Sequence, residues 1–107
     1  MGRAERDKGA RAEREVASLL TKAGFDGRRT AALQANAGRG ADVTGIPGVH
    51  LEVKFQEKLS LWAALRQAEE GAEAGEVPAV VFRKSREPWR VTIPLDYFLF
   101  LHAEKDL

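Results

Sequence analysis

Residues 49–56 read VHLEVKFQ, and this alternation of apolar and polar side chains constrains the rest of the fold. Side chains along a β-strand point alternately to its two faces. The apolar face carries Val49, Leu51, Val53 and Phe55, and the polar face carries His50, Glu52, Lys54 and Gln56. We therefore predict a strand that is buried on one face and presents a carboxylate and an ammonium group together on the other.

Helical and extended patterns lie on both sides of this strand. Before it, the spacing of apolar residues and the turn residues predict a helix over 8–23, a strand over 27–33, a loop over 34–40, a short strand over 41–44 and a turn over 45–48. After it, they predict a helix over 60–74 with Ser60 as N-cap, strands over 77–82 and 89–93, and a helix over 95–103 that Pro94 opens. This order indicates an α/β fold with a central mixed sheet flanked by helices.

Length and composition restrict the class of protein. The 107 residues are 44% hydrophobic and 31% charged, which is typical of one globular domain, and we expect residues 1–107 to form it. No stretch approaches the roughly 20 apolar residues that span a bilayer, so no membrane partner is expected. Residues 1–14 are charged throughout, unlike a secretory signal, and cysteine is absent. A cytoplasmic location is the resulting expectation.

Charge is unevenly distributed along the chain. Residues 1–40 hold nine Lys/Arg and five Asp/Glu, whereas residues 41–82 hold three and seven. A basic first segment and an acidic middle suit a protein with a phosphate-binding surface and a separate carboxylate cluster. Ordinary scatter of surface charge is the alternative explanation.

Two carboxylates and a lysine are expected to meet at one edge of the sheet. Folding back through the turn over 45–48 brings Asp42 beside Glu52, on whose face Lys54 also lies. Carboxylate pairs bind hard cations such as Mg²⁺, and a lysine beside them can orient water and offset developing phosphate charge. Glu13 lies at the border of the apolar face of the first helix, within reach of such a site. A solvated polar face, with Glu13 as a boundary residue, is the simpler alternative.

Five segments together carry a resemblance to a known family: residues 8–15 (KGARAERE), 41–43 (ADV), 51–54 (LEVK), 77–82 (VPAVVF) and 89–91 (WRV). They resemble the archaeal-type Holliday junction resolvases of the PD-(D/E)XK nuclease superfamily, over about Lys8 to Leu101. The Gly-x-x-x-Glu-Arg opening, the Glu-x-Lys strand and the Trp-Arg pair are specific together, whereas Glu-x-Lys alone is not. The short length and the ending at Pro94-Leu95-Asp96 look like a phage-encoded member, which would act in the host cytoplasm.

The resemblance implies a restriction-endonuclease-like fold and a Mg²⁺-dependent endonuclease, with Mn²⁺ as a substitute, that resolves four-way DNA junctions by paired nicking as a homodimer. It implies Asp42, Glu52 and Glu13 as metal-binding carboxylates and Lys54 as the catalytic lysine. Phosphate contacts are expected from basic residues of the first half of the chain: Lys8, Arg11, Arg14, Arg28, Arg29 and Arg39. Arg39 lies between two glycines that permit close backbone approach to DNA.

Four positions have no assigned role. The family's proline before the aspartate is Ala41 here, and its catalytic-loop serine has no clear counterpart, although Thr30 and Asn36 lie in that region. We interpret Gln67 as a surface glutamine. His50 shares a face with Glu52, but Mg²⁺ prefers oxygen ligands, which favours a bystander over a metal ligand.

Apolar residues gather in two further places, Leu59–Trp62 and Tyr97–Leu101. The second run is apolar all round, so one face is expected to fill the core and another to be covered by a partner. We predict a symmetric dimer held by both regions. The alternatives are another PD-(D/E)XK nuclease acting on flap, branched or repair DNA, and a catalytically inactive DNA-binding subunit.

Overall fold

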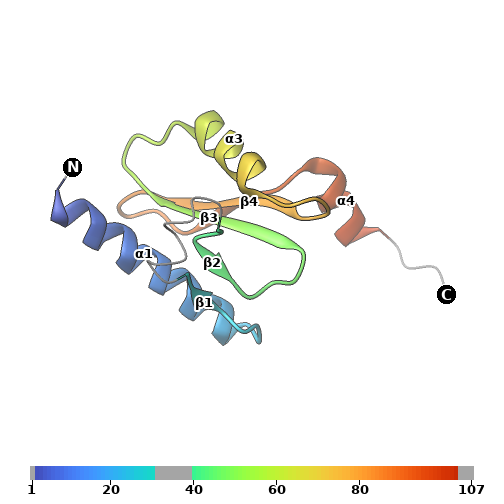
Figure 1. The fold of residues 1–107 in the computed structure, drawn as a ribbon, viewed down its shortest axis with the longest axis horizontal. Helices are drawn as coiled ribbons and strands as arrows, with labels where there is room; N and C mark the ends of the chain where they lie inside the picture. Colours follow the sequence, from blue (N-terminus) through green and yellow to red (C-terminus); the bar gives the residue numbers. More distant parts are fainter. Residues whose placement is uncertain (1, 31–39, 104–107) are drawn as a thin grey trace.

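A five-stranded mixed sheet with three helices makes up the part of the chain that the computed structural model describes, residues 2–30 and 40–103 (Figure 1). In chain order the elements are α1 (Arg3–Lys22), β1 (Arg28–Arg29), β2 (Val43–Thr44), β3 (Val49–Phe55), α3 (Leu61–Gly71), β4 (Val77–Arg83), β5 (Arg90–Thr92) and α4 (Leu95–His102). The strand order is β1-β2-β3-β4-β5, and only β3 and β4 are parallel. The predicted α/β class and the mixed, helix-flanked sheet are confirmed.

The pairing of β3 differs on its two sides. β4 pairs with β3 along its whole length, from Val49↔Val77 to Phe55↔Arg83, with α3 as the crossover that a parallel pair requires. β2 pairs with β3 at Val43↔Leu51 alone. Within the described residues, the second half of β3 therefore has no strand beside it on the β2 side.

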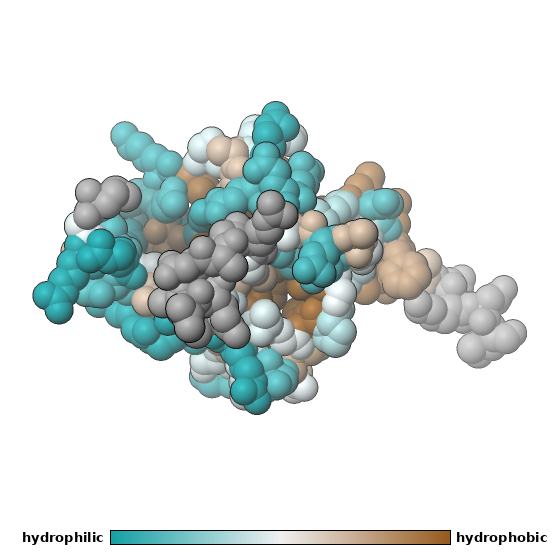
Figure 2. Space-filling view, in the orientation of Figure 1, coloured by the Kyte–Doolittle hydropathy of each residue, from teal (hydrophilic) through white to brown (hydrophobic). Residues whose placement is uncertain are grey.

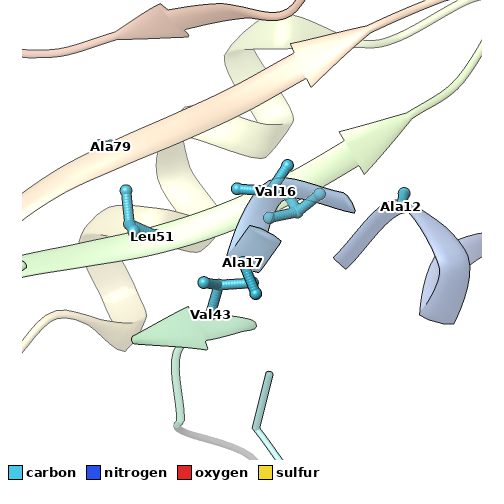
Figure 3. Packing of buried hydrophobic residues seen from close by; sticks show 7 residues of the cluster. Ala12, Val16, Ala17, Val43, Leu51 and Ala79 are labelled. Atoms are coloured by element: carbon cyan, nitrogen blue, oxygen red, sulfur yellow. The ribbon is translucent and has the colours of Figure 1, made fainter. Parts of the chain in front are cut away.

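The two faces of the sheet carry separate hydrophobic clusters. The face toward α1 buries Ala12, Val16 and Ala17 of the helix against Val43, Leu51, Val53 and Ala79 of the strands (Figure 3). The face toward α3 buries only Ala64, Ala68 and Val80. The predicted alternation of β3 is confirmed for the side of α1, where Leu51 and Val53 lie in the hydrophobic cluster. The opposite face is not open along its length, because α3 packs on that side of the sheet and His50 and Glu52 are buried.

A close approach of backbones fixes β1 beside α1. A Cβ atom on Gly27 would lie 2.2 Å from the carbonyl oxygen of Ala17, so only glycine fits there. The chain can then lead directly into Arg28 and Arg29 alongside the helix. This approach sets the position of Arg29 relative to α1.

Several predicted boundaries shift. α1 begins at Arg3 rather than residue 8, with the Glu5 carboxylate accepting a hydrogen bond from the backbone N–H of Gly2. α3 ends at Gly71 because Ala72 is extended. β1 covers only Arg28–Arg29, because Gly27 and Thr30 of its predicted range lie outside the strand. The remainder of its predicted range and most of the predicted loop lie in residues 31–39, outside the described residues. No helix among residues 2–30 and 40–103 is long and apolar enough to span a membrane.

The prediction that α4 contributes a face to the core is wrong. None of its residues is buried, and Leu95 and Leu99 are 71% and 56% exposed. The physical reason is its place at the end of the sheet, where apolar residues gather on the surface (Figures 1 and 2). A pocket there is lined by Tyr97 and by Val77 and Pro78 at the start of β4.

The second apolar region lies at the other end of β4. Leu59 and Leu61 line a pocket with Phe82 and Arg83, where β4 ends, and neighbouring Trp62 is 72% exposed. Since β4 is seven residues long, roughly 20 Å separates its two ends. The two apolar regions from which we predict a dimer therefore lie at opposite ends of β4.

Candidate active site at the edge of the sheet

Asp42 is fixed against β3 by backbone hydrogen bonds. Its N–H donates to the carbonyl of Leu51 at 2.9 Å, and its Oδ2 accepts from the N–H of Val53 at 2.8 Å. The carboxylate thus takes the place of a strand partner just before β2 begins, beside residue 52. The turn that folds Asp42 back onto β3 is the one predicted over 45–48, in which Gly45 has a φ of 142°.

Glu52 is a buried carboxylate with one unsatisfied oxygen. The residue is 4% exposed; its Oε2 lies 2.7 Å from Nε2 of His50, whereas its Oε1 is buried without a hydrogen-bond partner. Burial raises the pKa of Glu52 to about 7, and the charge of Asp42 beside it adds to the effect. The two carboxyl groups therefore repel each other when both are ionised, which a cation would relieve.

Lys54 is oriented by the crossover helix. Its Nζ donates a hydrogen bond to Oε1 of Gln67 at 2.8 Å, and both side chains line the same cleft. The interpretation of Gln67 as a surface glutamine is therefore incomplete, because this exposed side chain fixes the candidate catalytic lysine. The residues lie 13 apart in sequence, so only the packing of α3 on the sheet brings them together.

Glu13 faces the same cleft from α1. Its Oε1 accepts a hydrogen bond from Nε of Arg29 at 2.7 Å. Partial burial raises the pKa of Glu13, the hydrogen bond to Arg29 lowers it, and the charge of Asp42 raises it further, with a net upward shift. Arg29, predicted as a phosphate contact, is thus also the ion-pair partner of a candidate catalytic carboxylate.

These side chains share one cleft between α1 and α3. Its volume is about 550 Å³, and its walls include Lys8, Glu13, Asp42, Lys54 and Gln67. The structure thus brings Glu13, Asp42 and Lys54 together as predicted. Glu52 is a neighbour of Asp42, close enough for the charge of Asp42 to raise its pKa.

The other predicted DNA contacts are spread over α1 and β1. Lys8 lies in the cleft with its Nζ 4.7 Å from the centre of the Phe55 ring, while Arg11 and Arg14 are exposed on the same helix. Arg28 pairs with Asp26 at 3.1 Å. Arg39 lies outside the described residues.

Arg83, the last residue of β4, contacts the same Phe55 ring as Lys8. Its guanidinium lies 4.4 Å from the centre of the Phe55 ring and 5.3 Å from that of Trp89. Glu15 ties this group to α1, because it accepts a hydrogen bond from Nε1 of Trp89 at 2.9 Å and pairs with Arg83 at 3.6 Å.

Besides Gln67, two of the unassigned positions have contacts. The Thr30 hydroxyl donates to the carbonyl of Ala41, and its N–H donates to the carbonyl of Asp42 at 3.0 Å, so it holds the backbone that carries Asp42. His50 is buried against Glu52 rather than solvated, so it is no bystander to that carboxylate. Asn36 lies outside the described residues.

The donor set fits a hard divalent cation in part. Glu52 Oε1 is a buried acceptor without a partner, and Asp42 supplies a second carboxylate beside it. Glu13 is engaged with Arg29. Within residues 2–30 and 40–103, no three His, Cys, Asp or Glu side chains form a ready-made metal site. The pair Asp42 and Glu52 is therefore the part of the predicted metal site that the fold assembles.

Comparison with known proteins finds a likeness among solved structures. No family model and no curated protein matches the chain. Among solved structures, the Holliday junction resolvase Hjc of Archaeoglobus fulgidus, an archaeal hyperthermophile, matches with a TM-score of 0.60 and 26% sequence identity, over 80% of this chain and 72% of that one. This likeness shows that the two chains share a fold, and it supports the resemblance of this sequence to the archaeal-type Holliday junction resolvases.

Proposed function

We propose that this protein is a Mg²⁺-dependent, structure-selective DNA endonuclease of the PD-(D/E)XK type that resolves four-way junctions, with residues 1–107 as its nuclease domain. The observation that carries the proposal is the meeting of Asp42, Glu52 and Lys54 at one sheet edge beside a cleft with basic residues on its walls. The fold shared with an archaeal junction resolvase supports the choice of substrate.

The carboxylates Asp42 and Glu52, with Glu13 as a third, are the residues that would hold the metal. Mg²⁺ is the cofactor proposed, with Mn²⁺ as a substitute, because the donors are all carboxylate oxygens. When bound, such a cation polarises a phosphate oxygen and lowers the pKa of an attacking water. Glu13 uses its Oε1 in the hydrogen bond to Arg29, so its Oε2 could serve as a ligand without breaking that ion pair.

Lys54 has a role of its own in this scheme. Its ammonium group is held by Gln67 at the wall of the cleft, close to the carboxylate pair. A fixed positive charge there stabilises negative charge that develops on the phosphodiester during in-line attack by water. The hydrogen bond to Gln67 removes the rotational freedom that a free lysine would have to lose on substrate binding.

DNA would reach the cleft along α1. Lys8 lies inside it, and Arg11 and Arg14 continue along the helix as exposed cations. Contacts of this kind bind phosphates without reading sequence and weaken as salt rises. They place the scissile phosphate near Asp42 and leave selectivity to the shape of the DNA.

Dimerisation completes the proposal. The exposed apolar residues of α4, among them Leu95, Phe98 and Leu99, form a surface that association with a second copy would bury. Two active sites in one dimer would nick two strands of a junction as a pair. α4 lies at the opposite end of the sheet from the cleft, so the dimer contact would leave both sites accessible to DNA (Figure 1).

The test is incubation with synthetic four-way, flap and linear DNA, with Mg²⁺ or with EDTA. We expect paired nicks in the four-way junction with Mg²⁺ and no cleavage with EDTA. Equal cutting of all three DNAs would favour a less selective nuclease of the same superfamily. Tight binding without cutting in any metal would favour an inactive DNA-binding subunit. The matched control is Asp42→Asn, which keeps the size of the side chain and removes its charge.

A further inference from the structure

His50 and Glu52 form a buried pair on the α3 side of β3. Their side chains are 3% and 5% exposed, and Nε2 of His50 lies 2.7 Å from Oε2 of Glu52. They share a face because they are two residues apart in a strand. At this degree of burial each polar group depends on the other for its hydrogen bond.

The surroundings define which nitrogen of His50 carries the proton. A carboxylate that holds a cation is ionised and only accepts hydrogen bonds, so Nε2 would be the donor to Glu52 when the metal is bound. On the other side of the ring, Nδ1 lies 3.9 Å from Oε1 of Glu76. Glu76 is itself held, because the same oxygen accepts a hydrogen bond from the N–H of Glu73 at 2.8 Å. The ring therefore lies between two carboxylates.

The pair leaves one oxygen of Glu52 for an external ligand. His50 takes Oε2, and Oε1 is the buried oxygen without a protein partner. A carboxylate whose one oxygen is held by a hydrogen bond has little freedom to rotate. The orientation of its second oxygen is therefore fixed as well. Groups that hold a metal ligand in this manner change metal affinity by about 10- to 100-fold when they are removed.

We propose that His50 is a positioning residue that holds Glu52 for the divalent cation. This inference rests on the proposed function, since it assigns Glu52 to the metal. The competing explanation is a buried polar pair that only supports the fold. Loss of one partner of a buried pair lowers the stability of the fold under either explanation. Only a positioning role makes the affinity for the metal depend on the hydrogen bond to Oε2 of Glu52. Metal affinity, rather than stability, therefore separates them.

The experiment measures Mn²⁺ binding to the DNA-free protein by electron paramagnetic resonance, together with thermal unfolding in EDTA. Three variants of His50 are compared with the wild type. His50→Gln keeps an N–H group near the position of Nε2, whereas His50→Asn is too short and His50→Leu has no donor. The matched control is His102→Gln, which changes the other histidine of the chain, on exposed α4.

We expect His50→Asn and His50→Leu to weaken Mn²⁺ binding by about tenfold or more. His50→Gln should restore most of the affinity, and His102→Gln should not change it. The kcat of junction cleavage at saturating DNA should fall most in His50→Asn and His50→Leu, less in His50→Gln, and not in His102→Gln. If His50→Leu does not fold, the comparison of the Asn and Gln variants decides the question.

Unchanged Mn²⁺ affinity in folded His50→Asn, beside a wild type that binds Mn²⁺ and cleaves junctions, would overturn this inference alone. A wild type that neither binds Mn²⁺ nor cleaves would overturn the proposed function and this inference with it.

Discussion

Replacing Glu52 by glutamine should stabilise the metal-free protein at alkaline pH. The wild-type carboxylate is buried beside Asp42, and its Oε1 has no partner. Glutamine has nearly the same shape, carries no charge, and keeps an oxygen that can accept the hydrogen bond of His50. The substitution therefore removes an unfavourable buried charge without opening a cavity.

The size of the effect follows from the pKa of Glu52. Its folded-state pKa is about 7, against an ordinary 4.5, because of burial and the charge of Asp42. The folded protein therefore holds a proton between pH 4.5 and 7 that the unfolded chain releases. Stability falls as the pH rises through this range and stays low above it. This difference between the folded and unfolded pKa lowers the free energy of unfolding of the wild type by about 1–3 kcal/mol at pH 9. For a domain of this size, that corresponds to a shift in Tm of roughly 10 °C.

The assay is thermal unfolding in EDTA at pH 5 and pH 9. We expect Glu52→Gln to unfold at a higher temperature than the wild type at pH 9, with a smaller difference at pH 5. Glu69→Gln, on exposed α3, is the control for loss of a surface charge. A Glu52→Gln protein that is less stable than the wild type at pH 9, or equally shifted at both pH values, would refute the account of the carboxylate pair.

Three further outcomes follow from the same geometry. Without metal, Glu52→Gln should bind a four-way junction at least as tightly as the wild type does in gel-shift titrations. Its affinity for the junction should exceed its affinity for a linear duplex of equal length at two salt concentrations. Equal affinity for both DNAs would argue against junction selectivity. Gln67→Leu should slow cleavage by about tenfold while Mn²⁺ affinity is unchanged, because only the acceptor for Lys54 is lost; an unchanged rate would remove Gln67 from the site. Leu99→Glu should convert a dimer to a monomer in sedimentation at micromolar concentration, with an unchanged circular dichroism spectrum since the side chain is exposed; a dimer that survives would place the interface elsewhere.

The elements that the sequence predicts well are those set by local pattern. The alternation over 49–56 identifies β3 and its apolar face, because side chains that face one hydrophobic layer recur at every second position of a strand. The turn at Gly45 and the adjacent Asp42 then predict which carboxylates meet. Both inferences depend on residues close together in the chain.

The contacts that escaped prediction depend on tertiary packing. Gln67 reaches Lys54 only because α3 crosses over β3, and Arg29 reaches Glu13 only because Gly27 lets the backbone approach α1. The same limit explains the error at α4. Its apolar sequence is typical of a buried helix, but burial depends on where β5 delivers the chain, which is beyond the end of the sheet. The buried contact of His50 with Glu52 likewise depends on packing, because it forms on the face of β3 that α3 covers.

The most direct measurement of the central claim is cleavage of a supercoiled plasmid that extrudes a cruciform, which presents a four-way junction in closed circular DNA. Paired nicking across the junction gives a linear product, whereas independent nicking gives an open circle. With Mg²⁺ at pH 8, the wild type should produce linear DNA, and Asp42→Asn should leave the plasmid supercoiled although it still binds. Linear DNA produced by Asp42→Asn at the wild-type rate would contradict the assignment of the active site to this edge of the sheet.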